Sequence, residues 1–347
     1  MASLAKFHCS GYRVSTEAKT VFLSNRLLGT ISTLIGRLTR LEVFEIAEND
    51  FTGLIPSEMG KLTNLVEVYV YSNNLSGSIP SVIGQLTNLE VLDARDAELK
   101  GSIPSEIGKL TNLLKLRISH NDLSGAIPSE IGDLTNLLGI RVDYNNLSDS
   151  IPSEIGELTN MHVFNIQSNS FMGPIPSVIG QLSSLSYFYL HNNLLSGTIP
   201  DEIYRLESLI RFICFGNNLS GTISDQIGRL TNLTGIRIFD NAFSGTFPST
   251  VGNLANLQEL HIGDNAFTGT FPSTIGNLTD LWTFEIQHNL FTGTIPSELV
   301  LMENIRYMNT EWNNFTGTVS EDFCELEKLR DFYADCGPTN ITGPPAV

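Results

Sequence analysis

The sequence has few cysteines and no long apolar segment. Only four of its 347 residues are cysteine, too few for a disulfide-rich scaffold, and no C-x-x-C or paired-histidine spacing indicates a zinc site. No stretch reaches the roughly 18 apolar residues of a membrane helix, and residues 1–13 lack the apolar run of a secretory signal. Because no Ser-His-Asp grouping, phosphate loop or kinase signature is present either, we expect no catalytic residues, metal or cofactor.

Basic residues are also scarce. The chain has 20 Lys and Arg against 37 Asp and Glu, for a formal net charge of −17. This balance argues against nucleic acid and against anionic membrane surfaces as partners. Two explanations of the acidity stay open: solubility of an elongated molecule, or attraction of a basic ligand.

Residues 14–325 are filled by thirteen tandem copies of one 24-residue unit, which reads LTNLLKLRISHNDLSGAIPSEIGD at Leu110–Asp133. The copy that begins at Val14 is degraded and the one at Met302 is weaker. One such unit cannot bury its apolar side alone, so neighbouring units must stack around a shared core. We expect one solenoid over 14–325, the remnant of an N-terminal cap at 1–13, and a partial C-terminal cap with a disordered tail at 326–347.

Each position of the unit predicts a local structure. Apolar residues at positions 7 and 9 indicate a short strand, and the spacing from position 22 to the next position 1 indicates a short helical turn. Position 12 is Asn in twelve copies, which predicts a ladder of amides that bond the backbone of their own coil and the next. Ala97 is the gap in this column and a predicted weak point. Position 16 is Gly except at Asp149, and position 19 is Pro in ten copies, before a Ser that we expect to cap a helix.

The pattern resembles the leucine-rich repeat family, in the plant-type subclass with L-x-G-x-I-P after the Asn: LSGSIP at 75–80, LSGAIP at 123–128 and LSGTIP at 195–200. The resemblance implies an α/β solenoid, a right-handed superhelix with a concave parallel sheet, a second short sheet and short convex helices. Such repeats occur in plant receptor ectodomains, in secreted plant proteins and in diatom families. Members usually begin with a cap that contains W-x-G-V-x-C, of which only Phe7-His8-Cys9 is similar here. The chain therefore reads as a fragment, with a cytosolic protein as the alternative.

Ligand binding is expected where the strand residues are released from the core, at positions 6, 8 and 10 on the concave side. Tyr and Arg carry much of the binding energy at interfaces, and clustered exposed apolar residues mark contact sites. The alternative is that aromatic columns pack on each other within the sheet. We expect the adjacent Arg117 and Arg141 to be offset by Asp93 and Asp143 or by a ligand carboxylate, and His261 with Glu285 to be a surface pair. The candidate ligand-binding residues are Tyr69, Tyr71, Arg117, Arg141, Tyr187, Tyr189, His191, Arg211, Ile213, Phe215, Arg237 and Phe239.

Cysteines and glycosylation sequons add weaker predictions. Cys214 stands at position 9 and is expected to be buried. Cys324 and Cys336 lie in adjacent units, where a disulfide would seal the end of the core; a partner beyond the chain is the alternative. The N-x-S/T sequons are candidate glycosylation sites, although four of them follow from the repeat consensus: Asn74, Asn146, Asn218, Asn232, Asn277, Asn314 and Asn340.

The sequence therefore predicts a recognition scaffold without enzyme activity, extracellular or at the cell surface, that binds a peptide, protein or glycan. The first alternative is the ectodomain fragment of a receptor kinase. The second is a structural solenoid that binds ice or cell wall through a regular row of side chains, for which position 17 supplies Ser or Thr: Ser78, Ser102, Thr198, Thr222, Thr246, Thr270, Thr294 and Thr318.

Overall fold

A computed structural model describes residues 19–21 and 26–335 of the chain. The chain divides into two compact units, Met1–Phe171 (unit 1) and Met172–Val347 (unit 2). The predicted cap remnant at 1–13 and the tail beyond 335 lie outside the described residues, and the predicted domain boundaries stay predictions.

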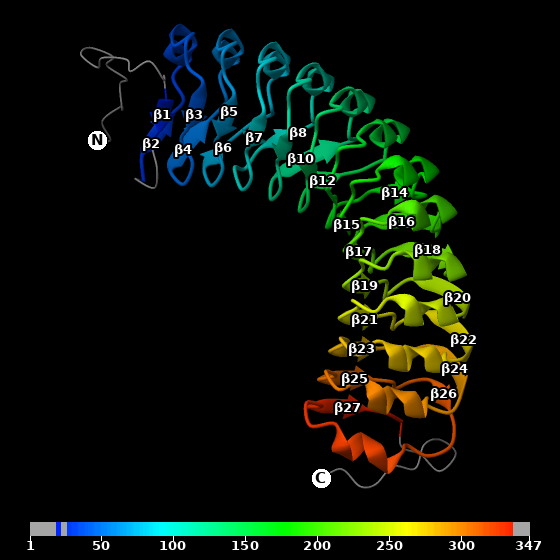
Figure 1. The fold of residues 1–347 in the computed structure, drawn as a ribbon. Helices are drawn as coiled ribbons and strands as arrows, with labels where there is room; N and C mark the ends of the chain where they lie inside the picture. The colour runs from blue at the N-terminus through cyan, green and yellow to red at the C-terminus, as the bar shows by residue number, and fades with distance from the viewer. Residues whose placement is uncertain (1–18, 22–25, 336–347) are drawn as a thin grey trace. The chain divides into compact units, whose positions relative to one another are not determined.

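Each copy contributes one three-residue strand at positions 6–8 to a parallel main sheet, and the segment after the thirteenth copy adds β27. Neighbouring strands pair with an offset of 24 residues, as Lys115 does with Gly139, so that equal positions of successive copies form columns. Figure 1 shows the strands following one another in sequence order within each unit. In unit 1 they are β1 (Lys19–Val21), β3 (Val43–Glu45), β5 (Glu67–Tyr69), β7 (Val91–Asp93), β9 (Lys115–Arg117), β11 (Gly139–Arg141) and β13 (Val163–Asn165). In unit 2 they are β15 (Tyr187–Tyr189), β17 (Arg211–Ile213), β19 (Gly235–Arg237), β21 (Glu259–His261), β23 (Thr283–Glu285), β25 (Tyr307–Asn309) and β27 (Asp331–Tyr333).

A second set of parallel strands begins at position 13 or 15, and its pairs are offset by 22 residues, as in Ser196 with Asn218. Unit 1 has two separate three-stranded sheets. They consist of β2 (Leu28–Thr30), β4 (Asp50–Gly53) and β6 (Asn74–Leu75), and of β8 (Lys100–Gly101), β10 (Asp122–Gly125) and β12 (Asn146–Leu147). Unit 2 has one seven-stranded sheet of β14 (Met172–Gly173), β16 (Leu194–Thr198), β18 (Asn218–Gly221), β20 (Ala242–Thr246), β22 (Ala266–Thr270), β24 (Leu290–Gly293) and β26 (Asn314–Phe315).

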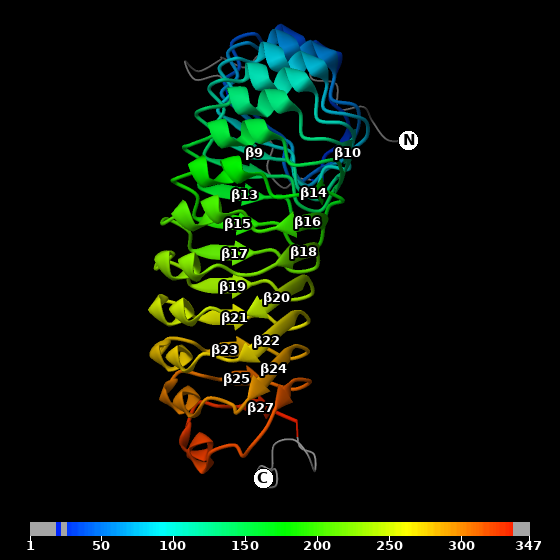
Figure 2. The same ribbon diagram turned by 90° about the vertical axis from the view of Figure 1, so that its right-hand side faces the viewer.

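Short helices of the 3-10 type close every coil at positions 20–24. In unit 2 they lie at one end of the main strands and the second sheet lies at the other (Figure 2). They are η1 (Thr33–Arg37), η2 (Ser57–Lys61), η3 (Ser81–Gln85), η4 (Ser105–Lys109), η5 (Ser129–Asp133), η6 (Ser153–Glu157), η7 (Ser177–Gln181), η8 (Asp201–Arg205), η9 (Asp225–Arg229), η10 (Ser249–Asn253), η11 (Ser273–Asn277), η12 (Ser297–Leu301) and η13 (Glu321–Glu325). The prediction of a parallel sheet, a second short sheet and short helical turns is confirmed.

The predicted helix cap was wrong. The position-20 Ser is the first helical residue, and the preceding Pro, for example Pro128, occupies the N-cap position without a side-chain bond. A capping hydroxyl occurs where position 19 itself is Ser. Ser32, Ser224 and Ser320 each accept a hydrogen bond from the backbone N–H two residues later. Proline favours the start of the helix in another way, because its ring fixes φ near the value that the N-cap residue has here.

The column of position-12 amides forms the predicted ladder, but in the opposite direction. Asn145 donates to the carbonyls of Val142 and Asp143 in its own coil (3.0 and 3.2 Å) and of Ile118 in the preceding coil (3.0 Å). Its Oδ1 accepts from the N–H of Leu123, also in the preceding coil (3.0 Å). Each amide therefore ties the end of its own main strand to the second strand of the copy before it, not the copy after it.

Two columns hold left-handed backbone. Position 16 has positive φ in the described copies, for instance +79° at Gly125, which explains its glycine; Asp149 adopts the same conformation with φ +67°. Position 11 is also left-handed but carries side chains, among them Tyr144 (φ 51°) and Trp312 (φ 56°). Nothing in the apolar pattern of the repeat marks this second column.

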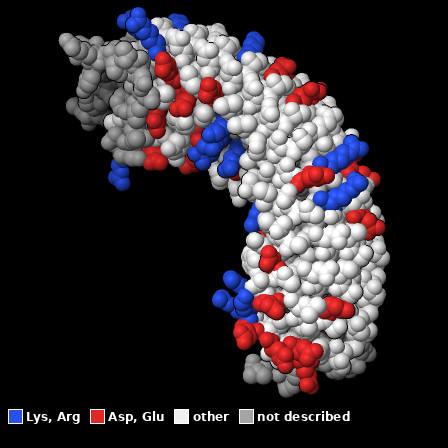
Figure 3. Space-filling view, viewed as in Figure 1, with Lys and Arg blue, Asp and Glu red and all other residues white. Residues whose placement is uncertain are grey.

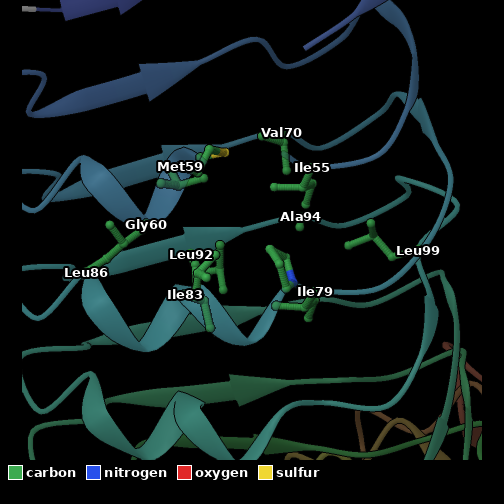
Figure 4. A pocket seen from close by; sticks show the side chains of 13 residues that line it. Ile55, Met59, Gly60, Val70, Ile79, Ile83, Leu86, Leu92, Ala94 and Leu99 are labelled. Atoms are coloured by element: carbon green, nitrogen blue, oxygen red, sulfur yellow. The ribbon is translucent and has the colours of Figure 1, made fainter. Parts of the chain in front are cut away.

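Copy four departs from its neighbours in the core. Position 9 is Ala94 there, between Val70 and Ile118, and a void of about 20 Å³ lies beside it. Figure 4 shows the short Ala94 side chain ending among Val70, Ile79 and Leu99. The lining is entirely apolar, so the void has no groups to hold water.

Candidate ligand-binding surface

Positions 6, 8 and 10 line one face of the main sheet in each unit, here called the main-sheet face. Position 7 is buried in the core, as with Leu116 at 1% exposure, while its neighbours Lys115 and Arg117 reach the surface. This alternation follows from the two-residue period of a strand. The candidate ligand-binding residues are therefore distributed between the main-sheet faces of the two units.

The main-sheet face of unit 2 carries a ladder of stacked rings. His191, Phe215 and Phe239, all at position 10, stack with centroid distances of 4.4 and 4.2 Å and interplanar angles of 24° and 10°. Tyr189 meets His191 edge-on at 6.4 Å, and His261 lies at 6.4 Å from Phe239. All five rings are half-buried. The rings use their faces on one another, as the packing alternative expected.

Not every apolar candidate is exposed. Tyr187 is exposed and lies 6.2 Å from Tyr189. Ile213, in contrast, is only 7% exposed, so its prediction as part of an exposed apolar patch was wrong. Its column neighbours on β15 and β19 are Tyr189 and Arg237, and both have long side chains. The aromatic residues rather than Ile213 form the accessible part of this surface.

The two arginines of this zone share one buried carboxylate. Arg237 Nη2 lies 2.7 Å and Arg211 Nη1 3.2 Å from Oε2 of Glu259, which is 4% exposed. Arg211 reaches across a whole copy to do so, and Gly235 stands between them: a Cβ there would lie 3.4 Å from Arg211 Nη1. The two guanidinium groups hold the pKa of Glu259 below its usual range against the opposing effect of burial. Arg211, Arg237 and the ionised Glu259 together therefore carry a net charge of +1, which is available to a ligand.

Three buried polar atoms on the same face lack a hydrogen-bond partner: His191 Nδ1, His261 Nε2 and Gln287 Oε1. Burial, and secondarily the charge of Arg237, lower the pKa of both histidines to about 4, so both rings are neutral near pH 7. His261 Nδ1 lies 3.5 Å from Oε1 of Glu285, whose pKa is raised by burial. Unpaired buried polar atoms are rare, and because these three have almost no accessible surface, a ligand reaches them only when the side chains over them move.

The main-sheet face of unit 1 is held together differently. Asp93, 1% exposed, accepts two hydrogen bonds from Arg95 (2.8 and 2.9 Å) and pairs with Arg117 at 3.5 Å. Asp143 instead accepts from Ser119 at 2.6 Å. Arg141 is exposed and makes no ion pair with any residue that the structure describes. The charge of Asp93 offsets that of Arg117, as expected. Arg141 faces solvent or a ligand.

Tyr69 and Tyr71, the two remaining candidates of unit 1, are half-buried on the same face. The Arg95 guanidinium lies 5.3 Å from the ring centroid of Tyr71, close enough for a cation–π contact. Burial is the largest cause that raises the pKa of both phenols, followed by nearby carboxylates such as Glu67 and Glu48. Both tyrosines therefore stay neutral hydrogen-bonding groups.

The cysteines and the asparagines of the glycosylation sequons differ in exposure. Cys214 is buried, and burial raises the pKa of its thiol, as expected for a small core residue. Cys324 is exposed, and Cys336 lies outside the described residues, so their bridge stays a prediction. Asn340 also lies outside them. Six sequon asparagines are exposed: Asn74, Asn146, Asn218, Asn232, Asn277 and Asn314.

Two negative findings hold for residues 19–21 and 26–335. No group of three or more His, Cys, Asp or Glu side chains is arranged to hold a metal ion. Over the same residues, none of the helices has the length and apolar character needed to cross a bilayer.

Sequence reasoning missed two sets of contacts. Position 3 forms a second amide column, in which Asn112 Nδ2, for example, donates to the carbonyl of Thr87 in the preceding copy (2.9 Å). The recurring L-T-N-L was the available signal. Tyr204 replaces a glycine, and its hydroxyl accepts from the N–H of Ser224 (3.2 Å), which replaces a proline in the next copy. Two departures from the repeat thus compensate one another.

Comparison with known proteins agrees with this geometry. A profile described as leucine-rich repeat region matches residues 19–125, and one described as Leucine Rich Repeat matches 184–206 and 256–278. The chain is a leucine-rich repeat protein. Among curated proteins no match was found.

Solved structures of other leucine-rich repeat proteins are similar to it. The plant peptide hormone receptor RGFR1 in complex with RGF2 is 36% identical with a TM-score of 0.85, covering 88% of this chain and 49% of that one. A TDR receptor is 30% identical with a TM-score of 0.80, covering 92% and 59%. A leucine-rich repeat protein of Leptospira interrogans is 27% identical with a TM-score of 0.67, covering 94% and 85%. The chain thus spans about half of the first receptor's length.

Proposed function

We propose that this leucine-rich repeat protein is a non-enzymatic recognition scaffold that binds a peptide or protein segment through the main-sheet face of unit 2. The observation that carries the proposal is the ring ladder His191–Phe215–Phe239 with Tyr189 beside it. These rings are half-buried without belonging to the core. Aromatic side chains contribute strongly to interface energy because they bring large contact area at little conformational cost.

The chemistry of the face favours an extended peptide over a glycan. Sugars stack on ring faces, but here the faces are already stacked on each other. The ring edges carry partial positive charge and suit carbonyl oxygens. The unpaired nitrogens of His191 and His261 and the unpaired Oε1 of Gln287 add sites that backbone N–H and C=O groups can satisfy once the side chains over them move.

The similar receptors support the same class of ligand, since RGFR1 was solved with the peptide RGF2. We assign the repeats to the plant-type 24-residue subclass and place the protein outside the cell or at its surface, as the ectodomain portion of a receptor-like protein. The His261–Glu285 pair is a structural contact and not a catalytic one, because neutral His261 has no further polar partner to form a relay.

The test begins with selection of binding peptides from a displayed random library against the purified protein. Affinities of the selected peptides are then measured by fluorescence anisotropy for Tyr189→Ala, Phe215→Ser and Phe239→Ser. Each substitution is expected to weaken binding about tenfold or more, as loss of an interface aromatic does. Tyr69→Ala, on the corresponding face of unit 1, is the matched control. Unchanged affinity in the three folded unit 2 variants would remove this site.

A further inference from the structure

The second sheet of unit 2 presents a surface of its own, here called the second-sheet face: the side chains at positions 13, 15 and 17 of copies eight to thirteen. Position 17 is Thr in all six copies and position 15 is Ser or Thr in all six. All six position-17 threonines are exposed: Thr198, Thr222, Thr246, Thr270, Thr294 and Thr318. Neither the core nor the main-sheet face accounts for this regularity.

Strand pairing turns these rows into a two-dimensional array. The register places Thr246 beside Thr268 and Thr270 beside Thr292, and Thr198 beside Ser220. Adjacent hydroxyl-bearing residues are therefore separated by one strand spacing of about 4.8 Å. Six copies extend the array over about 25 Å along the stack at that spacing.

The threonines share one orientation. An ideal Cβ built on the position-16 glycine of the following copy would lie 2.8 Å from Thr198 Cγ2, 2.8 Å from Thr222, 2.9 Å from Thr246, 2.9 Å from Thr270 and 3.0 Å from Thr294. Each of these five methyl groups thus packs over a glycine, and χ1 of a β-branched residue is stiff in any case. None of the six hydroxyls bonds to another described residue. The array is preordered, so little side-chain entropy is lost when it binds a surface.

Charge is absent from the face although the protein carries a net charge of −17. None of the eighteen residues at positions 13, 15 and 17 of copies eight to thirteen is charged or aromatic. The same positions in unit 1 include Arg26, Asp50, Glu98, Lys100 and Asp122, with an ion pair between the last two at 3.9 Å. Figure 3 shows unit 2 from the side of its short helices instead, where acidic and basic groups reach the surface.

We propose that the second-sheet face of unit 2 binds ice. A regular array of methyl and hydroxyl groups orders its hydration water without the tightly held shells of charged groups, whose removal on docking would be costly. The ordered layer can then join a water lattice. A crystalline polysaccharide is less favoured because the face offers no ring on which a sugar can stack.

The experiment measures thermal hysteresis and partition into a growing ice hemisphere, with protein from a host that does not N-glycosylate, because glycans on Asn218 or Asn314 would cover the face. We expect both activities in the unmodified chain and their loss in the Thr246→Lys/Thr270→Lys double variant. Ser102→Lys, the same position in unit 1, is the control and should retain both. Thr246→Val, which keeps the methyl group, should lose less than Thr246→Lys, and melting curves report whether each variant is folded.

Absence of both activities in the unmodified chain would overturn the proposal. So would equal losses in Ser102→Lys and the double variant, since the activity would then not belong to this face. Binding to cellulose or chitin particles that the double variant loses, without any partition into ice, would assign the face to polysaccharide instead. A dimer in sedimentation that the double variant dissociates would assign it to a second copy.

Discussion

The second sheets of the two units differ in continuity, and one interruption coincides with a gap in the amide column. Unit 2 has seven second strands in one sheet, whereas those of unit 1 form two sheets separated between β6 and β8. The separation falls where Ala97 interrupts the amide column. Elsewhere the position-14 N–H donates to the amide of the following copy, as Leu99 does to Asn121 (2.9 Å), but no carboxamide reaches Leu75. The buried amides therefore hold individual second strands, but they do not alone decide where a sheet ends: the sheet of β8, β10 and β12 stops at β12 although Leu147 keeps its bond to Asn169 (2.9 Å).

The structure partly compensates for the gap. Asn121 Oδ1 accepts from the N–H of Ala97 (3.1 Å) in addition to that of Leu99 (2.9 Å), and its Nδ2 donates to Ala94, Ile118 and Ser119. Glu98 takes a left-handed φ of 56°. One amide thus serves parts of two copies.

The largest expected effect is that of Asn121→Ala, which would leave two adjacent copies without their amide. Five hydrogen bonds are lost at a buried site, and we expect the free energy of unfolding to fall by about 4 kcal/mol. Asn145→Ala, in the intact part of the ladder, should cost about 3 kcal/mol. Urea titrations followed by circular dichroism measure both. Equal losses of unfolding free energy in the two variants would show that the missing amide at Ala97 does not make Asn121 more important than Asn145.

The histidines give the next contrast, since His120 and His162 of unit 1 are exposed while His191 and His261 of unit 2 are half-buried with pKa values of about 4. A folded pKa below the unfolded value means that the unfolded state binds more protons between pH 6.5 and 4. Stability should therefore be full above pH 6.5 and fall toward pH 4, by about 2 kcal/mol per buried ring after allowance for partial exposure.

His191→Phe extends the ring ladder with a group that does not titrate. Unfolding measured from pH 7 to 4 should lose part of its pH dependence in this variant. His162→Gln, at an exposed site in unit 1, serves as control and should keep the full slope. A slope in His191→Phe equal to that of the unmodified chain would show that His191 is not a source of the effect.

Asp149 is the third test, because it holds a left-handed conformation (φ +67°) in a column where the other described copies have glycine. Asp149→Gly removes the steric cost and should raise the free energy of unfolding by about 1 kcal/mol. The reverse change, Gly125→Asp at φ +79°, should lower it by a similar amount. Thermal melts of both variants measure these changes. If both variants were stabilised, or neither, the left-handed backbone would not be what sets the preference for glycine at position 16.

Filling the void at Ala94 should have the smallest effect. Ala94→Val adds apolar volume next to a void of about 20 Å³, which at roughly 24 cal/mol per Å³ corresponds to about 0.5 kcal/mol of stabilisation. Ile118→Val, at the same position one copy later, should instead cost about 1 kcal/mol. Chemical denaturation compares the two, and a destabilised Ala94→Val would indicate that the void is too small for the added methyl groups.

Most of what the sequence predicted correctly repeats with the 24-residue period, because each copy meets the same neighbours. Strand position, the presence of the amide column and the glycine conformation follow from that. The failures include periodic features that no apolar residue marks, such as the left-handed position 11 and the position-3 amides, and contacts that skip copies or combine exceptions. Arg211 reaches Glu259 across Gly235, which no periodic pattern predicts, and the burial of Ile213 depends on long neighbours that differ in every copy. The capping role of proline was missed because Ser is the usual cap.

Hydrogen exchange of single backbone amides tests the role of the ladder most directly. The Leu75 amide faces the gap at Ala97, whereas the equivalent amide of Leu123 donates to Asn145 (3.0 Å). We predict that Leu75 exchanges about tenfold faster than Leu123, the difference that a lost hydrogen bond of roughly 1.4 kcal/mol produces, and that Ala97→Asn slows Leu75 to the rate of Leu123. Equal protection of the two amides in the unmodified chain, or no change in Ala97→Asn, would contradict the claim that the amide column holds the second strands.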